Sequence, residues 1–346
     1  MTISANEVSA FGFVDALPMP VMIAGADGTV LRANELARAV FRTDLVGQGV
    51  ALFLRSPAIS QALREASSNR VASEITYTQH GIPERVFEVH VAPLPKGSGG
   101  EAAVLITLRD ATREQQIERM RSDFVANASH ELRTPLATLS GFIETMQGPA
   151  RDDAVAREKF LVVMKTQADR MSRLIEDLLS LGRIEISEHV TPEGDADLAV
   201  IARQACSLLE QLASEMDCKM QINLPVALPV KGDDRELLQV VHNLIENALR
   251  YGAGGKRVEI SGRDEGGRAV IAVKDFGPGI ASHHVPRLTE RFYRVNVQDS
   301  RTRGGTGLGL AIVKHIVNRH RGKLAISSEP GVGSCFMVSI PLEKSI

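Results

Sequence analysis

The chain has 346 residues, which predicts two to three domains at about 150 residues per domain. Its 44% hydrophobic and 24% charged residues are typical of a folded globular protein. Lys and Arg number 40 against 42 Asp and Glu, a net charge of −2 that argues against nucleic-acid binding. The three scattered cysteines, Cys206, Cys218 and Cys335, argue against a disulfide framework or a zinc knuckle.

The sequence shows neither a membrane-spanning segment nor a secretory signal. The longest uncharged stretch, residues 330–342, is too short and too interrupted by Pro, Gly and Ser to span a bilayer. The first 30 residues lack the basic segment and apolar run of a secretory signal. These features favour the cytoplasm, although the cytoplasmic part of a membrane-anchored protein would have the same composition.

Residues 1–111 carry the pattern of a β-sheet with small helices. Asp27-Gly28 predicts a turn between the first two strands, and residues 34–41 predict a short helix. Residues 96–100, Lys-Gly-Ser-Gly-Gly, predict a flexible turn. Five short strands are expected, at residues 21–24, 30–31, 75–78, 85–91 and 103–108.

Residues 112–190 predict two amphipathic helices joined by a loop near Gly148-Pro149. The first helix carries apolar residues from Ile117 to Met146. Seam residues of the second helix alternate in spacings of four and three, as in helical bundles: Phe160, Met164, Gln167, Met171, Leu174, Leu178 and Leu181. A lone hairpin would expose this seam, so we expect a homodimer in which two antiparallel hairpins form a four-helix bundle.

One turn of the first helix has the features of a reactive site. At 100° per residue His130 lies about 200° from the seam residue Leu132, and therefore faces solvent. Pro135 removes the amide that would bond to the Glu131 carbonyl, which weakens the helix beside the imidazole. Imidazole is a nucleophile near neutral pH; Glu131 could orient it, and Thr134 could position a water. The alternative is a surface histidine near an accidental proline.

Residues 191–346 mix helices and strands in the pattern of an α/β sandwich. Helices are expected at residues 198–216, 234–250 and 307–320. Strands are expected at residues 219–222, 258–261, 269–273, 324–327 and 335–340.

Two features of this region suit a nucleotide. Asn243 and Asn247 share one helix face, and neutral amides beside a polyphosphate suit Mg²⁺. Asp275 ends a strand and precedes Gly277 and Gly279, which would let backbone approach a flat ligand. Its carboxylate could accept a hydrogen bond from an exocyclic amine such as that of adenine. Taken singly, these patterns also fit a polar helix face and a turn.

A third feature is the glycine loop, residues 304–310, which opens a helix and predicts an anion site at the helix N-terminus. It lacks the Walker sequence and does not follow a strand as a Rossmann loop would. Before it lies a segment, residues 281–303, with few apolar residues; we call it the lid segment and expect it to be mobile and to meet phosphates. Its arginines are Arg287, Arg291, Arg294, Arg301 and Arg303.

With these residues in place, the chain resembles the sensor histidine kinases of two-component signalling. Ser129-His130-Glu131-Leu132-Arg133-Thr134-Pro135-Leu136 resembles the family's phosphoacceptor motif. The resemblance implies that His130 is phosphorylated and that Glu131 is its general base or orienting group. It also implies that Thr134 helps to dephosphorylate the partner.

The resemblance further implies an ATP site in the fold that these kinases share with gyrase-like ATPases. Asn247 falls where Mg²⁺ is held, Tyr251 where a tyrosine packs on adenine, and Asp275 where the adenine amine is read. Arg250 replaces the usual Lys, so its contact with phosphate survives with a different geometry. Arg294 falls at a phosphate contact. The other implied nucleotide-binding residues are Asn243, Gly277, Gly279, Gly305, Gly307, Gly309 and Leu310.

One position separates the kinases from the gyrase-like hydrolases, which place a catalytic Glu where this chain has Asn243. The nearby Glu246 is expected on a different helix face. The implied function is autophosphorylation of His130 from Mg²⁺-ATP and transfer to an aspartate of a response regulator. The alternatives are a phosphatase-dominant regulator or scaffold of the same pathway, and a chaperone-like ATPase, which Asn243 disfavours.

Residues 1–111 resemble PAS sensor domains more weakly, through Asp27-Gly-Thr-Val-Leu-Arg-Ala-Asn34 and Leu108-Arg-Asp-Ala-Thr112. The expected domains are therefore a PAS-like sensor (1–111), a helical signalling and phosphotransfer hairpin (112–190) and an ATP-binding domain (191–346). The layout most resembles the phosphate-regulon sensor kinases. Those usually begin with a membrane anchor, so the chain is expected to be either the cytoplasmic part of such a kinase or a soluble relative.

Overall fold

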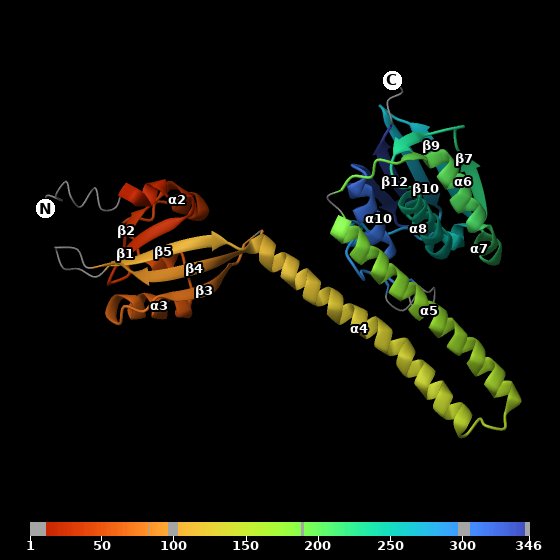
Figure 1. The fold of residues 1–346 in the computed structure, drawn as a ribbon, viewed down its shortest axis with the longest axis horizontal. Coiled ribbons are helices and arrows are strands. Elements are labelled where there is room, and N and C mark those ends of the chain that lie inside the picture. Colours follow the sequence, from red (N-terminus) through yellow and green to blue (C-terminus); the bar gives the residue numbers. More distant parts are fainter. Residues whose placement is uncertain (1–11, 82, 96–102, 188–189, 297–304, 343–346) are drawn as a thin grey trace. The chain divides into compact units, whose positions relative to one another are not determined.

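The computed structural model describes residues 12–81, 83–95, 103–187, 190–296 and 305–342 (Figure 1). The predicted turn at 96–100 and the lid arginines Arg301 and Arg303 lie outside these residues. The chain forms two compact units, Met1–Asp123 and Phe124–Ile346. None of the described helices combines the length and the apolar character that crossing a bilayer requires.

The first unit contains one antiparallel sheet in the order β2-β1-β5-β4-β3. All five predicted strands are present, each longer than predicted by one to three residues. They are β1 (Val21–Gly25), β2 (Val30–Ala33), β3 (Ser73–Gln79), β4 (Arg85–Pro93) and β5 (Ala103–Asp110). The sheet is accompanied by η1 (Gly12–Ala16), α2 (Glu35–Phe41), η2 (Val50–Leu52) and α3 (Pro57–Ser68).

Asn34 explains why the first helix of this unit begins where it does. Its side chain caps α2 by accepting from the Ala37 amide at 2.9 Å, and its amide donates to the carbonyls of Val14 and Met19. Helix α3 was not predicted individually, because its buried residues, Ile59, Ala62 and Ala66, are mostly alanines that give a weak apolar period.

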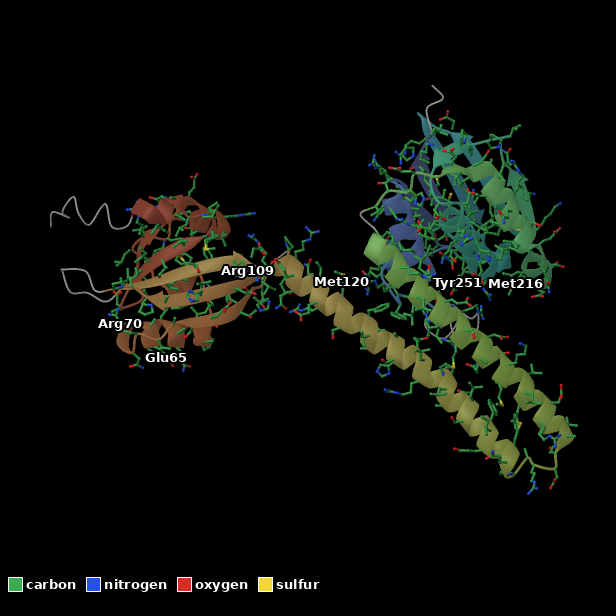
Figure 2. All side chains as sticks on the ribbon, viewed as in Figure 1. Glu65, Arg70, Arg109, Met120, Met216 and Tyr251 are labelled. Atoms are coloured by element: carbon green, nitrogen blue, oxygen red, sulfur yellow. The ribbon has the colours of Figure 1, made fainter. Side chains whose placement is uncertain are left out.

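The first unit ends in the beginning of a long helix, α4 (Thr112–Gln147). The Thr112 hydroxyl accepts from the Val86 amide at 2.9 Å, so the first residue of α4 is tied to β4. Arg109 lies near the end of β5, where that strand leads into α4 (Figure 2). It donates to Glu88 of β4 at 2.8 Å. The start of α4 is therefore anchored to the sheet from which it leaves.

In the second unit, α4 from Phe124 onward forms an antiparallel hairpin with α5 (Ala154–Ser187) (Figure 1). Every predicted seam residue of α5 is buried or half-buried, and Phe142 packs on Phe160 with ring centroids 4.9 Å apart. The turn near Gly148 is confirmed. Pro135 does not interrupt α4, and the helix runs through it with the proline buried.

The rest of the second unit is the predicted α/β sandwich, with a five-stranded sheet in the order β11-β12-β10-β9-β7. Only the β7–β9 pair of this sheet is parallel among the described strand pairs. The strands are β7 (Lys219–Asn223), β9 (Arg257–Asp264), β10 (Arg268–Asp275), β11 (Lys323–Glu329) and β12 (Gly333–Pro341). The helices are α6 (Leu198–Leu208), α7 (Glu210–Glu215), α8 (Asp234–Gly252) and α10 (Gly309–Arg319), with short turns η3 (Ala253–Gly255) and η4 (Val285–Arg287).

Three details of the sandwich differ from the prediction. The helix expected at 198–216 is divided at Leu209 into α6 and α7. The helix expected from residue 307 begins at Gly309, because Gly307 has φ +76°, outside the helical region. A two-stranded sheet, β6 (Asp195–Asp197) with β8 (Pro229–Lys231), was not predicted; three-residue strands carry almost no periodic signal.

One core holds the sandwich together and extends into the hairpin. Alternate residues of β12, from Ser334 to Ile340, are buried, and α8 buries one apolar face against the sheet. Leu174, Leu181 and Ile184 of α5 belong to the same buried cluster. The C-terminal half of α5 is therefore packed against the sandwich.

Candidate functional site

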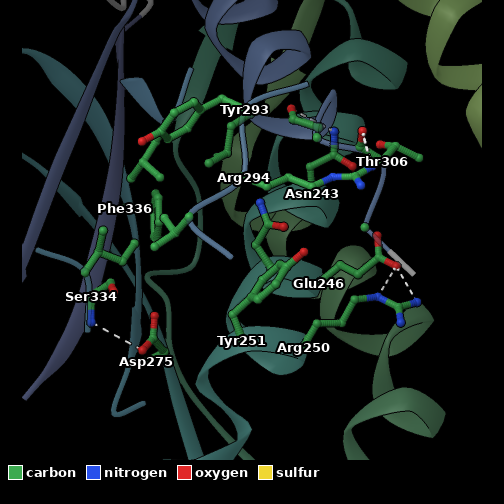
Figure 3. A pocket seen from close by; sticks show the side chains of 18 of the residues that line it. Asn243, Glu246, Arg250, Tyr251, Asp275, Tyr293, Arg294, Thr306, Ser334 and Phe336 are labelled. Carbon is green, nitrogen blue, oxygen red and sulfur yellow. Dashed lines mark hydrogen bonds and ion pairs between the residues drawn. The ribbon is translucent and has the colours of Figure 1, made fainter. Parts of the chain in front are cut away.

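The second unit contains a pocket of about 500 Å³ between α8, the loop after β10, the lid segment and the glycine loop (Figure 3). All of the predicted nucleotide-binding residues line it except Gly277. Those that do are Asn243, Asn247, Arg250, Tyr251, Asp275, Gly279, Arg294, Gly305, Gly307, Gly309 and Leu310. In the close view Asp275 and Ser334 lie at one side of the pocket, with Asn243 and Thr306 at the opposite side.

Asp275 ends β10 and is only 4% exposed. Its Oδ1 accepts from the backbone amides of Gly277 at 3.0 Å and Ser334 at 3.2 Å. Burial raises the pKa of this carboxyl, and the amide donors partly oppose that shift. Gly277 therefore acts on the pocket indirectly, because its amide fixes the orientation of Asp275.

Glycines make room for Asp275 at two positions that the sequence prediction did not assign to the site. A Cβ on Gly252 would lie 2.3 Å from the Cβ of Asp275, and one on Gly333 would lie 2.2 Å from the Asp275 carbonyl oxygen. Gly252 resembles an ordinary helix-ending glycine in the sequence. The sequence prediction gave Ser334 no individual role in the site, because its contribution is a backbone amide that any residue carries.

Helix α8 supplies one wall of the pocket. Asn243 donates to the Gly309 carbonyl at 3.4 Å, and Asn247 and Tyr251 follow at four-residue intervals on the same helix face. Glu246 was expected on a different face, but it lines the pocket as well, because the pocket is wide enough to border adjacent helix positions. Its Oε1 accepts from Arg250 Nε at 2.9 Å, so the two side chains form an ion pair along α8.

The glycine loop forms a neighbouring wall, which Asn243 of α8 contacts at Gly309. Gly307 has φ +76°, and a Cβ there would lie 2.9 Å from the Cα of Phe292, so this position requires glycine. The Thr306 hydroxyl accepts from the Leu308 amide at 3.3 Å and donates to Asp177 of α5 at 2.7 Å. Helix α10 begins at Gly309, so its N-terminus presents backbone amides at the pocket.

Arg294 connects the described part of the lid segment to both the glycine loop and the hairpin. One terminal nitrogen donates to the Thr306 carbonyl at 2.9 Å and to Glu131 Oε2 at 3.0 Å. Lid residue Phe292 also packs against Phe124 of α4, with ring centroids 5.9 Å apart. The lid segment therefore contacts α4 near the predicted phosphoacceptor.

His130 is exposed on α4, as the helical period predicts. The Thr134 hydroxyl donates to the His130 backbone carbonyl at 3.2 Å. Glu131, expected to orient the imidazole, accepts from Arg170 of α5 and from Arg294, each at 3.0 Å. The structure thus places Glu131 between two arginines that the prediction did not connect with it.

Helix α5 contributes residues that the sequence prediction missed. Arg173, Glu176 and Asp177 line the pocket, and Arg170 binds Glu131. Burial raises the pKa of the Asp177 carboxyl, while its hydrogen bond from Thr306 opposes the shift. In the sequence these are charged residues beside a heptad seam, a pattern that usually marks a solvated helix face.

Three protein-family models match the chain in succession. Residues 14–116 match the PAS fold, residues 120–186 match the His Kinase A (phospho-acceptor) domain, and residues 232–344 match the histidine kinase-, DNA gyrase B- and HSP90-like ATPases. The order of these matches agrees with the order of sheet, hairpin and α/β sandwich. The chain belongs to the sensor histidine kinases.

Its relatives include the phosphate regulon sensor protein PhoR of Pseudomonas aeruginosa, 40% identical over 241 residues. That match covers 68% of this chain and 54% of PhoR, so the chain spans about half the length of this relative. The Acinetobacter baumannii histidine kinase AdeS has a TM-score of 0.50 at 27% identity, covering 62% of this chain and 98% of that one. The kinase ThkA, solved with its response regulator TrrA, has a TM-score of 0.50 at 20% identity over 94% of this chain and 96% of that one, and shows the fold alone.

Proposed function

We propose that this chain is an ATP-dependent protein-histidine kinase that phosphorylates His130 and passes the phosphoryl group to an aspartate of a response regulator. One observation carries the proposal: the pocket that gathers the predicted nucleotide-binding residues is also lined by α5 of the phosphoacceptor hairpin. A nucleotide site and an exposed histidine thus belong to one compact unit.

The pocket suits ATP in one orientation. The buried Asp275 and the half-buried Tyr251 form a partly apolar end for adenine, where the carboxylate accepts from the exocyclic amine. The amides at the start of α10 and the guanidinium of Arg294 form an end for the phosphates. Arg250 is paired with Glu246, so its contact with phosphate requires that it also serve a second acceptor.

Magnesium fits this site as a companion of the nucleotide. Among the described residues no cluster of three or more His, Cys, Asp or Glu side chains could hold a metal ion alone. The Asn247 amide oxygen would hold Mg²⁺ together with phosphate oxygens, the hard ligands that this ion prefers. Bound there, Mg²⁺ would neutralise charge on the phosphates.

The chemistry is positioning and charge neutralisation. A ring nitrogen of His130 attacks the γ-phosphorus, the bond to the bridging oxygen breaks, and ADP leaves with that electron pair. The imidazole proton passes to a nearby base, for which Glu131 is the adjacent candidate. Asn243 stands where a hydrolase would carry a Glu, so water is not activated and the phosphoryl group is kept for His130.

We further propose a homodimer in the cytoplasm, where ATP and response regulators occur. The hairpin leaves large apolar side chains exposed on both helices, including Leu136 at 54%, Val162 at 61% and Leu179 at 59%. A second hairpin would cover them in a four-helix bundle. The near-zero net charge agrees with a protein partner and gives no support for nucleic acid. The phosphatase-dominant alternative is less favoured, because the pocket and the match to the phospho-acceptor domain both support a kinase.

The proposal is tested by incubating the protein with γ-labelled ATP. The wild-type chain should take up label that is stable in base and labile in acid, as a phosphohistidine is. His130→Gln should lose that label while still binding nucleotide. The control is His80→Gln, which removes an imidazole that is 86% exposed on the first unit and should label like wild type. Labelling that persists in His130→Gln would contradict the assignment.

A further inference from the structure

Two carboxylates of the hairpin engage the groups that border the phosphate end of the pocket. Glu131 of α4 accepts from Arg294 of the lid segment at 3.0 Å. Asp177 of α5 accepts from the Thr306 hydroxyl of the glycine loop at 2.7 Å. Arg294 and Thr306 both line the pocket, so each hairpin carboxylate holds a donor that an incoming phosphate would also seek.

These contacts are shielded from water. The side chain of Arg294 is 6% exposed and that of Glu131 16%, so their ion pair is stronger than a surface pair. Arg170, 13% exposed, binds the same Glu131 oxygen from α5. Two guanidinium groups therefore converge on one carboxylate oxygen next to His130.

The hydrogen bonding of Arg294 is incomplete in this arrangement. Both of its acceptors lie on one terminal nitrogen, whereas its buried Nε finds no hydrogen-bond partner among the described residues. A buried donor without an acceptor is unfavourable, and a guanidinium is built to hold oxyanions through two of its nitrogens at once. A phosphate would therefore offer Arg294 more acceptors than Glu131 and the Thr306 carbonyl supply.

Asp177 is the second part of this arrangement. Its carboxylate lies at the glycine loop, where the amides at the start of α10 would otherwise attract an anion. A negative charge at that position repels polyphosphate as long as it stays there. Asp177 thus borders the part of the pocket that the phosphates need, and Glu131 binds Arg294, which borders it as well.

We propose that Glu131 and Asp177 compete with the phosphates of the nucleotide for Arg294 and Thr306, and that phosphate binding displaces them. This inference rests on the proposed function, because it assumes that the pocket binds ATP. When Arg294 turns to phosphate, Glu131 keeps its ion pair with Arg170 and gives up the one with Arg294. The carboxylate beside His130 is therefore released from Arg294 when nucleotide arrives, which couples occupancy of the pocket to the surroundings of the histidine.

The test measures binding by calorimetry, not activity, because Glu131 lies next to His130. Probes are adenosine, ADP and a non-hydrolysable ATP analogue, the last two with Mg²⁺. Glu131→Ala and Asp177→Ala should each bind the phosphate-bearing probes about ten-fold more tightly, equivalent to about 1.4 kcal/mol, with adenosine unchanged. Asp169→Ala is the matched control, since it removes an acid of α5 that is 57% exposed and paired with Lys165.

A double-mutant cycle assigns the effect to Arg294. In an Arg294→Ala background, Glu131→Ala should change the affinity for the ATP analogue by less than about two-fold, because the contested donor is gone. If Glu131→Ala fails to fold, Glu131→Gln should show a smaller gain, since it keeps the hydrogen bond and removes the charge.

Three results would overturn the proposal: unchanged or weaker binding in Glu131→Ala, an equal gain for adenosine, or a gain that persists without Arg294. Absence of nucleotide binding by the wild-type chain would instead contradict the proposed function, and the competition with it.

Discussion

Asp275 shows how a single polar residue of this site depends on glycines that are distant in sequence. Gly252 comes from the end of α8, and Gly333 opens β12. Side chains at these positions would meet Asp275 at 2.3 Å and 2.2 Å, respectively. Gly333 also has φ +125°, so a larger residue there would strain the backbone as well. The position of the carboxylate thus depends on the space that these glycines leave as well as on its own hydrogen bonds.

Gly252→Ala should therefore displace Asp275 and weaken nucleotide binding by more than about ten-fold, if the carboxylate reads adenine. Forcing a methyl group into this contact should also lower the free energy of unfolding by about 1–3 kcal/mol. The matched control is Gly254→Ala, two residues along, where a Cβ would meet nothing within 4 Å. Calorimetry and denaturant unfolding of the two variants check both effects; equal behaviour of the pair would contradict this account of the Asp275 pocket.

Among single residues, those whose side-chain type indicates their chemistry could be predicted from the sequence. The paired asparagines of α8, Asp275 and the glycine loop all line one pocket as expected. The roles of Arg170 and Asp177 could not be predicted, because their partners Glu131 and Thr306 lie 39 and 129 residues away in the sequence. Such contacts depend on how the hairpin packs against the sandwich, which no local pattern encodes.

Among the elements, α8 and α10 are joined by a buried histidine. His320, the C-cap of α10, is 2% exposed and donates from Nδ1 to the Ile316 carbonyl at 2.8 Å. Its Nε2 accepts from the Asp233 amide at 3.0 Å, just before α8 begins. A carbonyl can only accept and an amide N–H can only donate, so both bonds require the neutral imidazole. Burial lowers the pKa of His320 from its ordinary value of 6.5, and the nearby Arg319 adds to this effect.

This pKa shift predicts how stability depends on pH. Because the folded state disfavours the charged imidazole, its stabilising contribution is complete above about pH 6.5 and falls as the pH drops toward the lowered pKa. His320→Gln can still accept from Asp233 but does not titrate, so its free energy of unfolding should fall less between pH 7 and pH 5 than that of wild type. Denaturant unfolding at several pH values checks this, with His80→Gln as the exposed control. Parallel pH profiles of wild type and His320→Gln would contradict it.

Elements with a clear period were predicted well, and short or alanine-rich ones were not. The seam of α5 and the buried face of α8 follow from apolar spacing alone. Helix α3 and the β6–β8 pair did not, since α3 buries mainly alanines and the two strands are three residues long. Helix α5 also packs against the sandwich, since Leu174 and Leu181 belong to the core of the sandwich. The heptad pattern predicted only its packing within the hairpin.

For the whole molecule, the exposed apolar residues of the hairpin carry the prediction of a dimer. Val162→Asp would place an uncompensated charge in the four-helix bundle. Because burying such a charge costs about 3–5 kcal/mol, the dimer dissociation constant should rise by about 100-fold or more. Analytical ultracentrifugation measures it, with Arg151→Glu in the hairpin loop as a control that also adds negative charge. A dimer that survives Val162→Asp unchanged would show that another surface joins the subunits.

The order of sheet, hairpin and sandwich was predictable because each has its own signature: alternation, a heptad, and a mixed α/β pattern with glycine-rich loops. Because the net charge of the chain is only −2, recognition depends on local groups, chiefly the arginines around the pocket. What the sequence could not supply is the docking of the lid segment on the hairpin, where Phe292 meets Phe124 and Arg294 meets Glu131.

The central claim is that the γ-phosphoryl group of ATP reaches His130. Mass spectrometry of peptides prepared at neutral to basic pH, after incubation of the full chain with Mg²⁺-ATP, tests it most directly. We predict one phosphate, carried by the peptide that contains His130, and its loss when a cognate response regulator is added. Phosphate on another residue, or steady consumption of ATP with the His130 peptide unmodified, would contradict it.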